Sequence, residues 1–243
     1  MQRREFVRLL GGASAAIWPF AARAQQGKRG PAQTTGPGPV MNALSNYMAG
    51  ARARALPEDV TEQAKVHLID TLAAMISGSE LPPGQAALRY IREHGGKGAI
   101  TVVASALAAA PTDAALANGV MAHADETDDS HNESRSHPGC AVVPAALALG
   151  EEYVVDGTAL LRAVTLGYDV GTRVILAMGG AAFSYESSLA THSIAGTFGA
   201  AAAAACAAGL DARQMRWALD YAAQQSSGIT ACLLYTSPSP RDS

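Results

Sequence analysis

A run of alanines towards the end of the chain is the feature that most constrains its fold. Every residue from Ala200 to Ala208 is alanine except Cys206. Alanine has the highest helix propensity, and side chains this small let neighbouring helices approach closely. The run therefore predicts a central, buried helix. We expect Gly209 to end this helix and Asp211 to open one more, through Gln225.

Apolar residues recur at helical spacing through most of the preceding chain. The expected helices cover residues 40–55, 57–78, 82–91, 113–122 (with Asp113 as N-cap), 144–152 and 159–178. Only residues 99–104 have a β-like pattern, and we expect an isolated extended piece there. Aromatic residues make up 5% of the chain, which suits packed helices better than a β-sandwich. We predict an all-α fold of about seven to nine helices over residues 40–231.

The N-terminal residues have the pattern of an export signal. A charged start, with the pair Arg3-Arg4, is followed by a short apolar stretch and by Ala22-Arg23-Ala24. This order predicts a signal peptide over residues 1–24 of the twin-arginine type, because about a dozen apolar residues are too few to span a bilayer. Residues 25–39 have the composition of a flexible linker. We expect a periplasmic protein with no membrane span after cleavage.

The last residues differ in character from the rest. The helical pattern stops after Ala231, and residues 232–243 contain two Ser-Pro pairs. This segment is typical of translated adapter sequence at the end of an assembled gene. We therefore expect residues 232–243 not to be native and the reading frame to be truncated near Ala231.

Charge and cysteine content narrow the possible partners. The formal net charge is -3, so the chain lacks the basic character of a nucleic-acid-binding protein. Its cysteines, Cys140, Cys206 and Cys232, are odd in number and widely spaced. They predict neither a disulfide framework nor a zinc site, and we interpret them as packing residues.

Ionisable residues concentrate between His123 and Pro144. Half of the 6 histidines of the chain lie there, together with Asp125, Glu126, Asp128, Asp129 and Glu133. Spacing alone leaves three interpretations open: a metal-free acid–base site, a solvated acidic loop, and a divalent metal site made by His123, Asp128, His131 and His137. The first is slightly favoured, because no familiar zinc or EF-hand spacing is present. His67, on the apolar face of an expected helix, is interpreted as a core or boundary histidine.

Several motifs follow one another along the chain: Asn118-Gly119 through His123, Asp128-Asp129-Ser130, His137-Pro138, residues 143–151, Gly167-Tyr168-Asp169-Val170 with Arg173, His192 with residues 196–200, and Ser227-Gly228-Ile229. In order and spacing they are similar to those of the MmgE/PrpD family, which includes 2-methylcitrate dehydratase and cis-aconitate decarboxylase. The resemblance covers roughly residues 41–231. It implies a helical N-terminal domain, a C-terminal α+β domain that this chain lacks, a homodimer, and metal-independent chemistry on small di- or tricarboxylates without a cofactor.

The resemblance also implies which residues carry out catalysis and which bind the substrate. Carried over by position, the catalytic residues are His137, Glu126, Ser130 and His192, and the substrate-binding residues are Asp129, His123 and Arg173. The family also uses a lysine after the Ser-Gly-Ile segment, and this chain departs from the pattern before reaching it. A cation for the substrate carboxylates would then have to come from Arg135 or Arg173.

The expected function is therefore that of a lyase that dehydrates a small polycarboxylate, as 2-methylcitrate dehydratase does. Because the lysine and the second domain are missing, we expect this chain to be a fragment with an incomplete site, inactive by itself. Decarboxylation or isomerisation of a related acid is the alternative within the family. An exported, non-catalytic carboxylate-binding or helical interaction protein is the alternative from another class. The export signal is itself a departure from the metabolic members of the family.

Overall fold

The computed structural model describes residues 36–187 and 189–228. The expected signal peptide, most of the linker, Ile229, Cys232 and the expected non-native tail lie outside these residues. The chain divides into two units, Met1–Pro39 and Val40–Ser243, and the fold described below belongs to the second.

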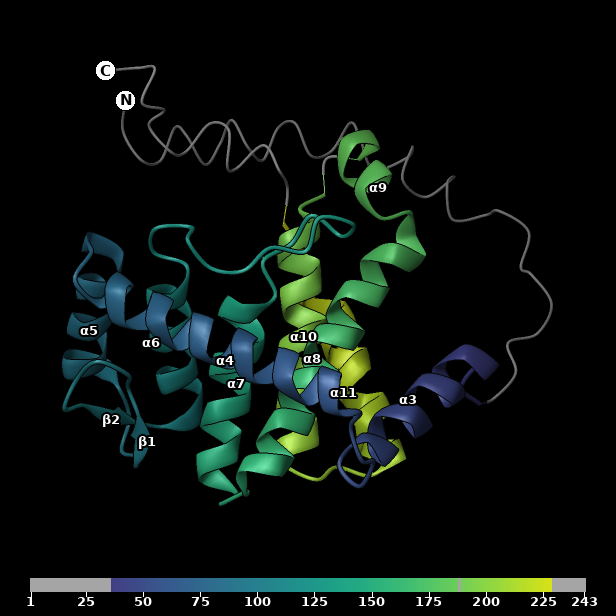
Figure 1. The fold of residues 1–243 in the computed structure, drawn as a ribbon, viewed down its shortest axis with the longest axis horizontal. Helices are drawn as coiled ribbons and strands as arrows, with labels where there is room; N and C mark the ends of the chain where they lie inside the picture. The colour runs from purple at the N-terminus through teal and green to yellow at the C-terminus, as the bar shows by residue number, and fades with distance from the viewer. Residues whose placement is uncertain (1–35, 188, 229–243) are drawn as a thin grey trace, which may run out of the picture. The chain divides into compact units, whose positions relative to one another are not determined.

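The described residues form nine α-helices and one pair of very short strands (Figure 1). The elements are α3 (Pro39–Ala51), α4 (Glu58–Ser79), α5 (Pro82–His94), β1 (Ile100–Thr101), β2 (Ala108–Ala109), α6 (Pro111–Ala122), α7 (Gly139–Glu152), α8 (Gly157–Met178), α9 (Ala181–Glu186), α10 (Thr191–Ala207) and α11 (Ala212–Gln225). The prediction of an all-α fold is confirmed. Within the described part of the chain, no helix has the length and apolar character needed to cross a bilayer.

The alanine-rich helix α10 is central, as predicted, and packs most extensively against α8 and then α7 (Figure 1). Ala202 and Ala203 are fully buried. Where α10 crosses α8, glycine is needed as well: a Cβ on Gly171 would lie 2.6 Å from the carbonyl oxygen of Ala195. The helix begins at Thr191, before the alanine run, so His192 lies in its first turn.

Two expected helix starts are wrong. Asp113 is not an N-cap, because α6 begins at Pro111, and the Asp113 carboxylate instead accepts a hydrogen bond from the backbone N–H of Gly96 (3.2 Å). Helix α7 begins at Gly139 and contains Pro144 in its interior. Pro138, with φ of -67° and ψ of -34°, is already helical and sets this earlier start. The expected start at Asp211 is confirmed by a capping box with Gln214.

The extended piece expected at residues 99–104 is not isolated. Ile100 pairs with Ala109 and Thr101 with Ala108 in an antiparallel arrangement. The buried Asn118 of α6 supports this pair, because its amide donates to the Thr101 carbonyl (3.0 Å) and accepts from the Val103 N–H (2.9 Å). The partner strand consists of two alanines, which have no β-pattern, so the pairing could not be recognised from the sequence.

Candidate active site

Three histidines from separate parts of the chain meet at one end of α10. His123 is the C-cap of α6, His137 comes just before α7, and His192 lies in the first turn of α10. Their ring centroids are 4.9 to 5.4 Å apart. The loop between α6 and α7 is closed by a bridge in which the His131 N–H donates to the Ser136 carbonyl (2.8 Å). This loop brings His137 back to His123.

Asp128 provides a buried carboxylate behind the cluster. Its Oδ1 lies 3.0 Å from Nδ1 of His123 and 4.0 Å from Nδ1 of His137. The hydrogen bond to Asp128 is the main reason why the pKa of His123 is raised, and it outweighs the opposing effect of burial. Because Nδ1 of His123 faces this carboxylate, its Nε2 is left to exchange a proton with a ligand.

The backbone around His137 fixes the state of His192. The His137 N–H donates to Nδ1 of His192 (3.1 Å), so the neutral His192 ring carries its proton on Nε2. Burial, followed by repulsion from His123 and His137, lowers the pKa of His192 to about 4. At neutral pH this ring is therefore an uncharged donor rather than a base.

His137 is oriented by the preceding loop. Its Nδ1 lies 2.9 Å from the carbonyl oxygen of Asp129 and 3.2 Å from Oγ of Ser130. The carbonyl can only accept, so we assign the Nδ1 proton to this bond. The lone pair of the neutral ring is then on Nε2. His137 and His123 can take up a proton, and His192 can donate a hydrogen bond from Nε2.

Asp129 joins the loop to two helices. One carboxylate oxygen lies 3.1 Å from Nδ1 of His67 in α4, and the other accepts from the N–H of Gly139 at the start of α7 (2.9 Å). Burial alone would raise the pKa of Asp129, but the interactions with His67, Tyr168 and Gly139 outweigh it, and the pKa is lowered. Asp129 is therefore a stable carboxylate that positions the loop.

His67 and Asp128 are the residues that sequence reasoning undervalued. The ring of His67 lies against that of Tyr168 in a tilted arrangement, with centroids 4.6 Å apart, and His67 pairs with Asp129. The sequence predicted a core or boundary histidine, and His67 is partly buried. Its partner Asp129 belongs to the α6–α7 loop, and no sequence motif links His67 to this distant loop. Asp128 belongs to the acid–base and metal interpretations of the sequence but not to the predicted catalytic or substrate-binding residues, although its place in the Asp128-Asp129-Ser130 motif pointed to it.

The structure brings together five of the seven predicted site residues: His123, Asp129, Ser130, His137 and His192. It does not bring Glu126 and Arg173 into direct contact with them. Glu126 is exposed, with a left-handed φ of 56°, and its charge only adds to the raised pKa of His123 after the contributions of Asp128 and burial. Arg173 is exposed on α8 and forms an ion pair with Asp169.

Two hollows flank the histidine cluster. The larger, of about 580 Å³, is lined mainly by small apolar residues of α6, α7 and α10, together with His123, Cys140 and His192. The smaller, of about 400 Å³, is mostly polar and includes Ser130, Arg135 and His137. The imidazoles therefore face an apolar space on one side and a polar space on the other.

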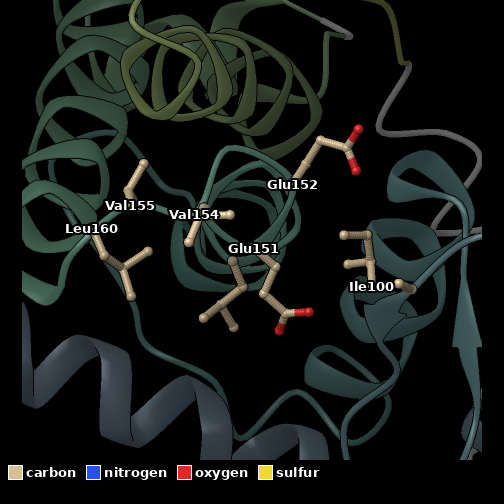
Figure 2. A pocket seen from close by; sticks show the side chains of 9 residues that line it. Ile100, Glu151, Glu152, Val154, Val155 and Leu160 are labelled. Atoms are coloured by element: carbon tan, nitrogen blue, oxygen red, sulfur yellow. The ribbon is translucent and has the colours of Figure 1, made fainter.

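A further hollow of about 580 Å³ lies between β1 and the α7–α8 connection (Figure 2). Ile100, Val155 and Leu160 line it together with Glu151 and Glu152, whose carboxylates point in different directions (Figure 2). Glu151 already accepts a hydrogen bond from the Thr101 N–H (2.8 Å). None of the lining residues belongs to either hollow beside the histidines, so this space is separate from the candidate site.

The metal ligands considered from the sequence are not gathered around one point. The Nδ1 atom of His131 instead lies within hydrogen-bond distance of the Ser134 Oγ (2.8 Å). Among the described residues, His123, Cys140 and His192 are the group with metal-ligand spacing, their ligand atoms lying within 4.8 Å of one another. Burial raises the pKa of the Cys140 thiol, and Nδ1 of His192 already accepts a backbone hydrogen bond. This chemistry suits proton transfer better than metal binding.

Together, the fold and the cluster define a helical domain that carries a cluster of three histidines beside a buried carboxylate. Residues 42–236 match the family model of the MmgE/PrpD N-terminal domain. The chain belongs to the MmgE/PrpD family, as its motifs predicted.

Curated relatives include proteins named as cis-aconitate decarboxylases. The chain is 30% identical to the cis-aconitate decarboxylase-like protein oryM of Aspergillus oryzae, over 82% of this chain and 42% of that protein. It is 28% identical to the human cis-aconitate decarboxylase, over 79% of this chain and 40% of that protein. It is 25% identical to the cis-aconitate decarboxylase of Aspergillus terreus, over 56% of this chain and 29% of that protein. The chain thus spans less than half the length of these relatives.

Proposed function

We propose that this chain forms the proton-transfer part of a lyase that acts on a small polycarboxylate. The observation that carries the proposal is the cluster of His123, His137 and His192 over the buried carboxylate of Asp128, with an open hollow on each side. The names of the curated relatives support the lyase class. The low identities leave both decarboxylation and the dehydration expected from the sequence as candidate reactions.

Both reactions need the groups of this cluster. In a decarboxylation, the bond between carbon and a carboxylate breaks, carbon dioxide leaves, and the electron pair left on carbon takes a proton from an imidazolium. In a dehydration, an imidazole takes a proton from carbon, and an acid protonates the hydroxyl that leaves as water. We assign the proton exchange at carbon to His137 and hydrogen-bond donation to a substrate oxygen to His192. His123, whose pKa is raised beside Asp128, is the second proton donor.

Substrate binding and turnover can be measured together. We would titrate the protein with cis-aconitate, citrate and 2-methylcitrate, follow the imidazole C2–H resonances by NMR, and look for new product signals in the same samples. Because the three histidines and Asp128 are already assembled within this chain, we expect product formation, in contrast to the inactivity expected from the missing domain. His137→Ala should abolish it with the helical content unchanged. His94→Ala is the matched control, because His94 is exposed on α5 and stacks on Tyr90.

Each outcome separates the candidate functions. Product that persists in His137→Ala would contradict the role of His137. Resonance shifts without any product would contradict catalysis by this chain and favour the exported carboxylate-binding protein. The absence of both shifts and product with all three acids would contradict the proposed function.

A further inference from the structure

Arg135 is held in an unusual conformation two residues before His137. Its φ of 48° is in the left-handed region, which a residue with a Cβ adopts at a cost in energy unless its surroundings fix it. The Arg135 carbonyl accepts a hydrogen bond from Oγ1 of Thr191 (2.9 Å), and the neighbouring His131–Ser136 bridge closes the loop. These contacts hold the backbone of Arg135 in place and so fix the direction in which its side chain leaves the loop.

The guanidinium of Arg135 is held by an aromatic side chain. It lies over the ring of Tyr185 in α9, with Cζ 4.7 Å from the ring centroid, and its Nη1 donates to the Tyr185 hydroxyl. Among residues 36–187 and 189–228, no carboxylate forms an ion pair with it. A guanidinium held in this way keeps its full charge and most of its N–H donors for a ligand.

Arg173, the other cation that the sequence offered for this purpose beside Arg135, lies in a different environment. It forms an ion pair with Asp169 on the same helix, and this carboxylate also accepts a hydrogen bond from Tyr47 (2.8 Å). A substrate carboxylate would have to compete with Asp169 for Arg173. At Arg135, no carboxylate of the described residues would compete with the substrate.

The hollow beside Arg135 is suited to an anion. Its side chains are polar apart from Ala181, and its lining within the described residues contains no Asp or Glu: Ser130, His131, Asn132, Arg135, Ser136, His137, Ala181 and Tyr185. Its volume of about 400 Å³ is within the range of small-molecule sites. Ser130 and His137 belong both to this lining and to the histidine cluster. An anion bound here would therefore lie next to the imidazole assigned to proton exchange.

We propose that Arg135, held by Tyr185, forms a carboxylate-binding subsite that anchors a non-reacting carboxylate of the substrate beside His137. The inference rests on the proposed function only in that the ligand is a polycarboxylate. The planar guanidinium can hold both oxygens of one carboxylate, which fixes the orientation of the rest of the molecule. Ser130 offers a further donor to the same group.

Citrate is the binding probe, measured by calorimetry on the whole chain at low and high salt. Arg135→Gln should weaken citrate binding by about 10- to 100-fold, the effect of removing a charged hydrogen-bonding group. Arg135→Lys keeps the positive charge but lacks the paired N–H donors of the planar guanidinium. Its citrate affinity should lie between those of Arg135→Gln and the unaltered chain. Tyr185→Leu, which releases the guanidinium, should weaken binding less than Arg135→Gln. Arg173→Gln tests the competing cation. Arg213→Gln is the matched control, because the Arg213 guanidinium also lies over an aromatic ring, that of Trp217, and this variant should bind citrate as the unaltered chain does.

The results distinguish this subsite from the proposed function. Equal citrate affinity in Arg135→Gln and the unaltered chain would overturn the subsite, and unchanged turnover of cis-aconitate would leave the lyase proposal standing. Citrate binding that is lost in Arg135→Gln, without turnover of any acid, would support the subsite and contradict the lyase. Circular dichroism and the unfolding midpoint of each variant show whether the fold is retained, and a lower affinity in a folded Arg173→Gln would also overturn the assignment.

Discussion

Asp129 connects the active-site loop to two helices, and its charge should therefore stabilise the fold. Its pKa is lowered in the folded protein, so the carboxylate contributes stability above the unfolded pKa, near 4. That stability is lost as the pH falls through the lower, folded pKa. We expect Asp129→Asn to reduce the free energy of unfolding at pH 7 by about 1–3 kcal/mol.

The measurement is urea unfolding at several pH values between 7 and 3, as far down as the native state persists. The unaltered chain should lose the Asp129 contribution below about pH 4, so the difference between the two proteins should shrink there. His67→Gln should reproduce part of the effect, because it removes the side-chain partner at 3.1 Å. A difference that stays constant over the whole pH range would contradict the assignment.

His192 should make the folded protein less stable as the pH falls, because its pKa is lowered. A histidine in a salt bridge, whose pKa is raised, would have the opposite effect. Its pKa is lowered to about 4 by burial and by the nearby His123 and His137. Between that value and the unfolded pKa, near 6.5, the unfolded chain binds the extra proton. Stability is therefore lost as the pH falls from about 6.5 to about 4, by an amount on the order of 2–3 kcal/mol.

NMR titration of the His192 C2–H resonance checks this directly, with His192→Asn identifying the signal. The resonance should stay in its neutral position down to about pH 5 and change only below it. His94, exposed on α5, provides the reference resonance in the same spectra. A His192 midpoint above that of His94 would contradict the neutral donor role.

Helix packing at the crossing of α8 and α10 depends on residues without a Cβ. A Cβ on Gly171 would meet the Ala195 carbonyl at 2.6 Å. We expect Gly171→Ala to lower the free energy of unfolding by about 1–3 kcal/mol, because two backbones must move apart. Gly157→Ala is the control on the same helix, since a Cβ there meets nothing within 4 Å.

Chemical denaturation of the two alanine variants tests this packing. Gly157→Ala should be neutral or stabilising by up to about 1 kcal/mol, because it restricts the unfolded chain. Similar stability changes in the two variants would show that backbone entropy, and not the close approach of α8 and α10, decides the result.

Elements specified by neighbouring residues were predictable, and those specified by distant contacts were not. The alanine helix and the Asp211 cap are local, because helix propensity and capping act within a few residues. The β1–β2 pair depends on the amide of Asn118 from α6. The first turn of α7, which Pro138 begins, is also stabilised by Asp129, whose carboxylate accepts the N–H of Gly139 across the loop.

The same distinction holds for the candidate site. The resemblance to the family indicated His137 and His192, because their motifs are local stretches of sequence. The pairing of His67 with Asp129 and the placement of Arg135 over Tyr185 each join segments that are far apart in the chain. Only the fold shows that Arg135, and not Arg173, is free of a carboxylate partner in the described part of the chain.

At the scale of the whole molecule, the site forms only when most of the chain has folded. Its residues come from α4, the α6–α7 loop, the start of α7 and α10. Cys140 and Cys206 are buried and form no disulfide with each other.

The twin-arginine signal expected at residues 1–24 belongs to an export route that carries proteins already folded. We expect the whole chain, expressed in a bacterium with a twin-arginine system, to appear in the periplasmic fraction after loss of the signal. Arg3→Lys with Arg4→Lys should keep it in the cytoplasm at its full length, because the charge remains but the recognised pair is gone. Arg8→Lys, in the same charged segment, is the matched control and should be exported. Immunoblots of the two fractions measure the distribution, and export of the Arg3/Arg4 variant at the level of the control would contradict the twin-arginine assignment.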